Sequence, residues 1–221
     1  MRTPRRYDER CGVAHALDLV GQRWALLVVR ELLLGPKRFT DLRTSIPHAT
    51  PDLLSRRLKE LQANGVIHRR RLAPPAASSV YELTAWGREL EPAVIALGRW
   101  GGRSPHLPTD APVGADSIML GLRTFFEPER VPDLRATYRV VLGSAVFRVR
   151  LDRGAIRVDR LEDSEVDATI ETDPATLASL LAGSESVDAV TRSGRAVISG
   201  SARGLQRLID AVRLPDTDAR D

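Results

Sequence analysis

Hydrophobic positions in the first hundred residues recur at the spacing of an amphipathic α-helix. Apolar side chains share one face of residues 13–20, and a second helical pattern runs from about residue 23 to residue 34, where Gly35 and Pro36 interrupt it. A short third helix is expected at residues 39–44, ahead of Pro47. The pattern therefore predicts three helices in close succession.

A fourth helix has the clearest start in the chain. Thr50 suits the N-cap, Pro51 the first helical position and Asp52 the first turn, where the helix dipole favours an acidic side chain. Leucines at i, i+4 and i+7 predict a buried stripe, and short polar and cationic side chains lie on the opposite face. The helix is expected to end at Asn64 and Gly65.

Two strands, at residues 66–72 and 80–83, follow this helix, with three consecutive arginines at the base of the connecting tip. Thr84 then begins a last helix that Pro92 is expected to kink. This order predicts a winged helix-turn-helix, mostly α-helical with a small β wing, whose fourth helix enters the major groove of double-stranded DNA. The predicted DNA-binding residues are Lys37, Arg38, Thr50, Pro51, Asp52, Ser55, Arg56, Arg57, Lys59, Arg69, Arg70 and Arg71.

A stretch rich in Gly and Pro ends the helical half and predicts a linker at residues 104–115. Beyond it, one helix is followed by alternating strands with hairpin turns, a helix capped by Asp173, a short strand and a final helix. We expect an α+β domain with an antiparallel sheet backed by helices. The expected limits are 1–103 for a DNA-binding and dimerisation domain, 104–115 for the linker, 116–214 for a ligand-binding domain and 215–221 for a tail.

The charge of the chain is divided unevenly between these two halves. Residues 1–103 carry 18 Lys and Arg against 10 Asp and Glu, and residues 104–221 carry 15 against 19. A basic half joined to an acidic one is typical of a protein in which one unit meets a polyanion. Taken singly, the fourth helix is better interpreted as an ordinary amphipathic surface helix, and the three arginines as a solvated charge run. Their succession favours DNA binding.

Several short motifs in residues 10–101 occur in a characteristic order. They are Cys11 ahead of ALDLVG, GQRW at 21–24, LGPKRF at 34–39, a leucine repeat at 53–61, NGV at 64–66 and YELT at 81–84. With them, the stretch resembles the HxlR-type branch of the MarR-like winged-helix regulators. The resemblance implies a homodimer on a roughly palindromic operator, with dimer contacts from the first and last helices of the domain. The dimer candidates in the last helix are Val94, Ile95, Leu97 and Trp100.

The second half shows a looser pattern of Asp-Pro, Leu-Leu-Ala-Gly, Gly-Arg and a late Gly-x-x-x-x-Leu. On this pattern, residues 115–214 resemble the sterol carrier protein type-two-like fold. The resemblance implies an apolar tunnel and a small hydrophobic ligand. The candidate lining residues, each of which is also typical of a plain core, are Met119, Leu122, Phe125, Phe126, Phe147 and Leu177.

Cys11 is the only cysteine, so an internal disulfide and a zinc site of several cysteines are excluded. Regulators of the resembled HxlR type include sensors of electrophiles or oxidants with a cysteine just before the first helix. A helix N-terminus and nearby arginines favour a reactive thiolate at Cys11. The alternative is an inert thiol that packs as a small hydrophobe.

Other chemistry is not indicated by the sequence. The four histidines are scattered, and there is no phosphate-binding loop, nucleophile elbow or metalloprotease motif, so we expect no metal, no cofactor and no enzyme. The longest apolar run is far too short to cross a bilayer. We therefore expect a cytoplasmic protein without a membrane partner, and the HxlR-type resemblance implies a nucleoid-associated protein of a bacterium.

Three hypotheses follow for the function. The first is a DNA-binding repressor whose operator affinity is modulated by a small hydrophobic ligand in the second domain. The second keeps DNA binding but makes Cys11 the switch, with the second domain as a brace of the dimer. The third is a carrier of lipids or hydrophobic ligands whose winged helix mediates protein contacts.

Overall fold

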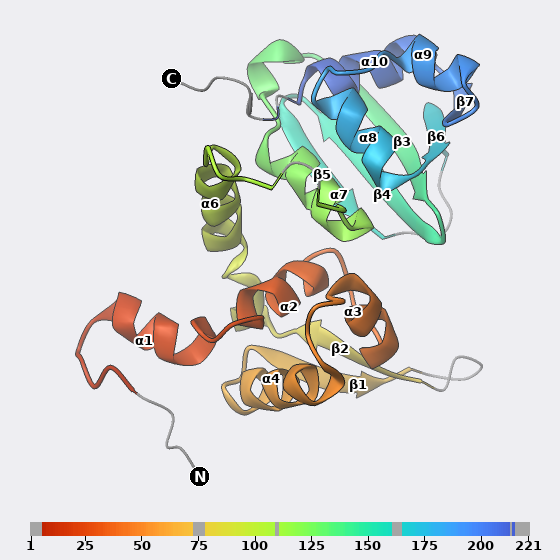
Figure 1. The fold of residues 1–221 in the computed structure, drawn as a ribbon. Helices are drawn as coiled ribbons and strands as arrows, with labels where there is room; N and C mark the ends of the chain where they lie inside the picture. The colour runs from red at the N-terminus through yellow and green to blue at the C-terminus, as the bar shows by residue number, and fades with distance from the viewer. Residues whose placement is uncertain (1–5, 73–77, 109–110, 161–164, 213, 215–221) are drawn as a thin grey trace. The chain divides into compact units, whose positions relative to one another are not determined.

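The computed structural model describes residues 6–72, 78–108, 111–160, 165–212 and 214. It divides into two compact units, Met1–Val94 and Ile95–Asp221, whose elements are labelled in Figure 1. The tip of the predicted wing, residues 73–77, and the predicted tail, residues 215–221, lie outside the described residues.

The N-terminal unit consists of helices followed by a strand pair, in the order that the sequence predicts. Its elements are α1 (Gly12–Val20), α2 (Ala25–Leu32), α3 (Phe39–Ser45), α4 (Pro51–Ala63), β1 (Ile67–Arg71), β2 (Ser79–Leu83) and α5 (Ala85–Arg88). The single last helix that was expected is divided in two, because α5 ends at Arg88 and α6 (Glu91–Gly102) begins again with Pro92 in its first turn. A proline is tolerated there, where its missing N–H breaks no helical hydrogen bond.

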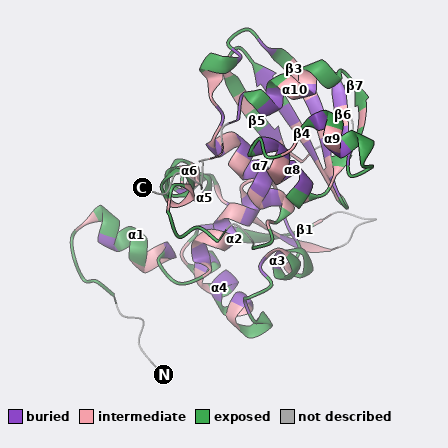
Figure 2. Ribbon diagram, turned by 45° about the horizontal axis from the view of Figure 1, so that its top comes forward, coloured by how far each residue is buried: buried purple, intermediate pink, exposed green. Residues whose placement is uncertain are grey.

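The core of this unit is built around α2. Ala25, Val28 and Val29 have no exposed surface, and α2 packs against α3, α4 and β2. Figure 2 shows this burial, with α1 exposed along much of its length. The core therefore fixes α3 and α4 relative to each other and to the strand pair, which is the framework on which a helix-turn-helix depends.

The C-terminal unit is an α+β fold around a five-stranded sheet in the order β5-β4-β3-β6-β7. Its elements are α7 (Ala115–Thr124), a 3₁₀ turn (Pro128–Arg130), β3 (Arg135–Leu142), β4 (Ala145–Asp152), β5 (Ala155–Asp159), β6 (Ala168–Thr172), α8 (Pro174–Leu181), α9 (Val187–Arg192), β7 (Val197–Gly200) and α10 (Ala202–Asp210). The expected α+β class and the helical backing of the sheet are confirmed, since α7 packs on β5 and α10 on β6.

One pairing in this sheet differs from the antiparallel expectation. The pairs β3–β4, β4–β5 and β6–β7 are antiparallel, but β3 and β6 run parallel. Both tight turns were visible in the sequence: Gly143 has φ +62°, and Arg153 and Gly154 have φ +45° and +79°, as two-residue hairpin turns require. β5 and β6 are consecutive in the chain but are not neighbours in the sheet, because β4 and β3 lie between them.

Alternate side chains along the strands face the helices and form the core of the unit. Tyr138, Phe147 and Ile170 have no exposed surface. The predicted tunnel residues belong to this packed interior. Met119, Leu122, Phe126, Phe147 and Leu177 are each less than 8% exposed, and Phe125 is half-buried. The cavity described below is lined by other residues, so the assignment of these six to a ligand tunnel stays a prediction.

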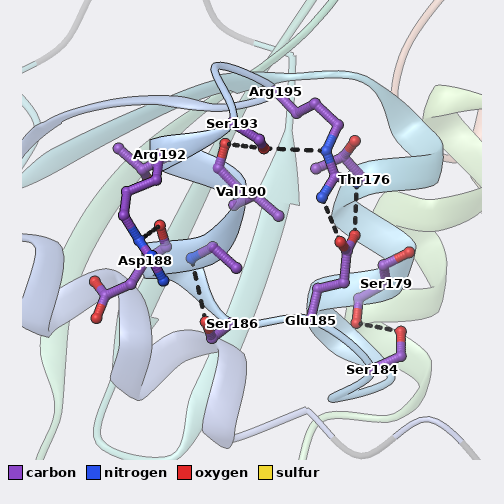
Figure 3. Close-up of polar contacts among 12 residues, drawn as sticks. Thr176, Ser179, Ser184, Glu185, Ser186, Asp188, Val190, Arg192, Ser193 and Arg195 are labelled. Carbon is purple, nitrogen blue, oxygen red and sulfur yellow. Dashed lines mark hydrogen bonds and ion pairs between the residues drawn. The ribbon is translucent and has the colours of Figure 1, made fainter.

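Polar contacts hold the segment between α8 and β7 in place (Figure 3). The Ser186 hydroxyl caps α9 by accepting a hydrogen bond from the Ala189 N–H at 3.2 Å. Just beyond α9, the Arg195 guanidinium donates to the Glu185 carboxylate, with Nη1 2.7 Å from Oε2, and Nε donates to the Ser193 hydroxyl. Hydrogen bonding from Arg195 lowers the pKa of Glu185. The two ends of α9 are thereby tied together.

Candidate nucleic-acid interface

The start of α4 has the capping geometry that its sequence predicts. The Thr50 hydroxyl accepts a hydrogen bond from the Leu53 N–H at 3.4 Å, Pro51 occupies the first turn, and Asp52 lies beside the positive end of the helix dipole. Ala49, in the turn before the cap, is 2% exposed. The turn is thus anchored in the core, which fixes the direction in which α4 leaves it.

The two faces of α4 differ as expected. Leu54, Leu58 and Leu61 are at most 1% exposed, and the helix packs on α2 and β1. The residues of the opposite face are Thr50, Pro51, Asp52, Arg56 and Lys59, all exposed, and Ser55, which is half-buried. An α-helix with short polar and cationic side chains on one open face fits the width of the DNA major groove.

Arg57 does not belong to that open face. Arg57 is 6% exposed, and its guanidinium pairs with the Glu60 carboxylate one turn further along the helix. The prediction that Arg57 contacts DNA is therefore corrected. Position 57 follows Arg56 by 100° around the helix, which turns its side chain toward the leucine stripe and away from solvent.

Lys37 is also inside the unit, although the sequence analysis assigns it to DNA. It is 4% exposed, and its ammonium donates to the Glu31 carboxylate at 2.5 Å and to the Ser45 hydroxyl at 3.0 Å. The cause lies in the backbone: the N–H and C=O of Lys37 both pair with Tyr81 of β2, at 3.0 and 2.8 Å. This isolated bridge holds the backbone of Lys37 against β2, with the side chain turned inward.

Arg38, the next residue, remains exposed. It is the N-cap of α3, and its backbone N–H donates to the Asp41 carboxylate at 3.0 Å. Sequence reasoning missed a neighbouring cation on the same helix, Arg43, which is exposed together with Thr40 and Thr44. The signal was present, because the spacing i, i+3, i+4 places these three side chains on one face of a helix.

The arginines of the wing lie on the exposed residues of β1, which pairs antiparallel with the more buried β2. In the register of β1 and β2, Arg69 lies opposite Tyr81 and Arg70 opposite Val80. The Arg70 guanidinium makes a two-point contact with the Glu82 carboxylate, at 3.2 and 3.1 Å, and it is the main cause of the lowered pKa of Glu82. Arg70 is thus partly neutralised, while Arg69 lies 6.0 Å from the centre of the Tyr81 ring.

This arrangement matches a known family of regulators. The model of the HxlR-like helix-turn-helix family matches residues 19–107. The uncharacterized HTH-type transcriptional regulator YybR of Bacillus subtilis is 37% identical over 95 residues, which are 42% of this chain and 74% of that protein. The chain belongs to the HxlR-like helix-turn-helix family.

Other HxlR-like relatives are similar over the same region. The HTH-type transcriptional regulator YodB of Bacillus subtilis is 34% identical over 85 residues, which are 38% of this chain and 76% of that protein. The solved structure titled redox regulator HypR in its oxidized form has 34% identity and a TM-score of 0.40, covering 42% of this chain and 97% of that one. Its membership of the HxlR-like family and its curated relatives identify the protein as a transcriptional regulator of this family.

The second unit matches a different family. The model of the SCP-2 sterol transfer family matches residues 124–213, in agreement with the resemblance seen in the sequence. This HxlR-like regulator therefore carries an SCP-2 domain that follows its DNA-binding unit in the sequence. Within the ranges that the structure describes, no helix is long and apolar enough to span a membrane, and no cluster of three or more His, Cys, Asp or Glu side chains is placed to hold a metal ion.

The predicted dimer residues of α6 differ in their exposure. Val94 is 9% exposed and Ile95 is half-buried, so these two side chains offer little free surface. Leu97 and Trp100 are 48% and 73% exposed. On α1, Val13 and Leu17 are likewise exposed, at 70% and 41%. Large apolar side chains are thus left uncovered on both helices.

Cys11 is the N-cap residue of α1 and is partly exposed. The backbone N–H groups of Ala14 and Val13 lower the pKa of its thiol, because unpaired N–H groups at a helix N-terminus stabilise a negative charge.

Proposed function

We propose that the protein is a homodimeric transcriptional repressor that reads a roughly palindromic operator with α4. The open face of α4, with Arg56 and Lys59 above a fully buried leucine stripe, is the observation that supports this assignment. Two recognition helices related by a twofold axis would enter successive major grooves about 34 Å apart. The exposed arginines of β1 would contact the flanking phosphates.

Binding to DNA from the chain's own promoter tests this proposal. Fluorescence anisotropy with labelled duplex should give a specific complex whose affinity falls steeply with salt, because bound phosphates release counterions. Arg56→Ala with Lys59→Ala should reduce specific affinity at least tenfold, since each base contact contributes about 1–3 kcal/mol. Arg130→Ala with Arg192→Ala, which removes the same charge from exposed positions of the other unit, is the matched control and should bind normally.

The dimer is proposed to form through the exposed apolar side chains of α1 and α6. Burying a large apolar side chain contributes about 1.5–3 kcal/mol. Burial of Leu17 and Trp100 against a second copy of the chain would therefore stabilise a dimer. Sedimentation should give a dimer for the natural chain and a monomer for Trp100→Glu. Val197→Glu changes a comparably exposed side chain, 60% accessible on β7, and should leave the dimer intact. A monomeric natural chain would refute this part.

Control by a small ligand is proposed for the SCP-2 domain, supported by the match of residues 124–213 to a sterol transfer family. A ligand changes operator affinity only if it binds the DNA-competent and incompetent states unequally. Adding fatty acids or sterols to the promoter complex tests this directly. Unchanged operator affinity at saturating ligand would refute the proposal that a ligand of the SCP-2 domain controls DNA binding.

A thiol switch at Cys11 is the second candidate, favoured by its lowered pKa at the start of α1. The thiolate would react with an oxidant or electrophile, and the modified α1 would shift the dimer. Operator binding should then respond to diamide in the natural chain but not in Cys11→Ser. An equal response of both proteins would exclude this switch. The carrier hypothesis is not retained, because the relatives of the helix-turn-helix unit are transcriptional regulators.

A further inference from the structure

The C-terminal unit contains a cavity of about 330 Å³ that none of the predicted tunnel residues lines. It lies where the start of β3 meets the first turns of α10. Its walls are formed by Leu134, Arg135, Ala136, Tyr138, Asp167, Ser201, Arg203, Gly204 and Arg207. This volume is at the lower end of the range of small-molecule pockets.

The charged wall of the cavity is mainly cationic. Arg203 and Arg207 are four residues apart on α10, so their side chains share one face of the helix. Among the contacts of the described residues, neither guanidinium makes a hydrogen bond or an ion pair. Arg135, by contrast, pairs with Asp152 at 3.3 Å. Two guanidinium groups thus border the cavity without a hydrogen-bonded or ion-paired partner among the described residues.

The acidic residue of the wall is already engaged. The Asp167 carboxylate accepts a hydrogen bond from the backbone N–H of Thr137 at 2.7 Å. Its backbone carbonyl also accepts from the Ser201 N–H at 2.9 Å, at the start of α10. Asp167 therefore ties the N-terminus of α10 to β3, and one carboxylate opposes three arginines.

The remaining wall is apolar and rigid. Leu134 is 7% exposed and Tyr138 has no exposed surface. The Tyr138 hydroxyl donates to the Gly204 carbonyl at 2.8 Å, and burial raises the pKa of this phenol to about 12, so it adds no negative charge. A Cβ at Gly204 would lie 3.0 Å from the Ser201 hydroxyl and 3.4 Å from that of Tyr138. Glycine at this position thus avoids crowding the Ser201 and Tyr138 hydroxyl groups.

We propose that the cavity binds a small amphipathic organic anion. Arg203 and Arg207 hold its oxyanion, because a guanidinium fork matches the geometry of a carboxylate or phosphate group. Leu134 and Ala136 contact its apolar part. This assignment differs from a purely hydrophobic ligand, and only its effect on DNA rests on the proposed function.

Titration calorimetry on the full chain tests the site. The probes are octanoate and phenyl phosphate, with octanamide as the neutral match and inorganic phosphate as the oxyanion without an apolar part. We expect one of the two amphipathic anions to bind, and the neutral and inorganic probes to bind at least tenfold more weakly. Arg203→Gln and Arg207→Gln should each weaken binding about tenfold or more, since a hydrogen bond to a charged group is strong. Arg192→Gln, an exposed arginine of α9, should change nothing.

Several outcomes would overturn the site. Equal binding of octanamide or of inorganic phosphate would contradict recognition of an amphipathic anion. Unchanged affinity in both α10 variants, or no binding of either anionic probe at millimolar concentration, would do the same. Loss of operator affinity in Arg203→Gln and Arg207→Gln without any probe would assign these arginines to DNA instead.

Anisotropy with promoter DNA separates this inference from the proposed function. If a probe binds but leaves operator affinity unchanged, the cavity is an anion-binding site, and the proposal that a ligand controls the repressor is refuted. If the operator is bound specifically but no anionic probe binds, the anion-binding proposal is refuted and the DNA-binding proposal is supported.

Discussion

Replacing Lys37 by Met distinguishes a structural role from a DNA contact. The Glu31 carboxylate is 2% exposed and accepts from Lys37 at 2.5 Å and from Arg30 at 2.7 Å. Removing one partner of a buried ion pair costs about 3–5 kcal/mol, because a charge remains without compensation. Arg30 still contacts Glu31, so we expect the lower end, about 3 kcal/mol. That is a large share of the stability of an ordinary domain.

Urea unfolding of the full chain, followed by circular dichroism, measures this effect. With a slope of about 2 kcal/mol per molar urea, the midpoint of the N-terminal unit should fall by about 1.5 M. Glu31→Leu combined with Lys37→Met replaces the pair by apolar side chains and should recover most of the loss. That double variant should still bind operator DNA.

Arg38→Met is the matched control, because Arg38 is the exposed neighbour of Lys37. It should change stability by less than about 0.5 kcal/mol, as surface substitutions usually do, but weaken DNA binding. The reasoning is refuted if Lys37→Met unfolds at the same urea concentration as the natural chain and loses operator affinity. Lys37 would then act on DNA after all.

Three further predictions concern capping and protonation. Thr50→Ala removes the N-cap of α4 and should lower stability by about 1 kcal/mol, which thermal unfolding would detect, whereas Thr50→Ser should not. The pKa of Tyr138 is raised to about 12 in the fold, so its contribution to stability is complete below pH 10 and is lost as the pH rises to 12; unfolding of Tyr138→Phe between pH 9 and 12 should lack this component. The Asp173 carboxylate accepts from Thr176 and Ala175 and has a lowered pKa, so its contribution is present at neutral pH and is lost as the pH falls below about 4. The acid limb of the stability profile should therefore be shallower in Asp173→Ala, and an unchanged limb would contradict this capping role.

Much of the fold follows from local rules that act over a few residues. The N-cap at Thr50, the hairpin turn at Gly143 and the cap at Asp173 each determine backbone geometry through their own side chain or φ angle. These signals are readable in one sequence because their partners lie within four residues. The same applies to the amphipathic faces of α4, since helical spacing alone separates the leucine stripe from Arg56.

Long-range pairing explains most of what the sequence did not reveal. Lys37 is turned inward by its backbone pairing with Tyr81, 44 positions away, and no local pattern reports that contact. The parallel pairing of β3 with β6 likewise depends on a crossover rather than on a turn. Arg57 is a different case, because its angle around α4 was readable and its cationic type misled the assignment.

The cavity of the C-terminal unit shows the same limit. Its walls come from the start of β3, from Asp167 and from α10, segments that only the tertiary fold brings together. Large apolar residues were the natural candidates for a lipid-like pocket, and none of them lines this cavity. The arginines of α10 had no distinguishing neighbours in the sequence.

The central claim is that the open face of α4 reads DNA, and one measurement tests it most directly. Anisotropy with promoter DNA and with a scrambled duplex, for the natural chain and for Arg56→Ala with Lys59→Ala, gives a ratio of specific to non-specific affinity. We predict a ratio well above ten for the natural chain and near one for the variant, with non-specific binding only slightly reduced. An undiminished ratio in the variant would contradict the account.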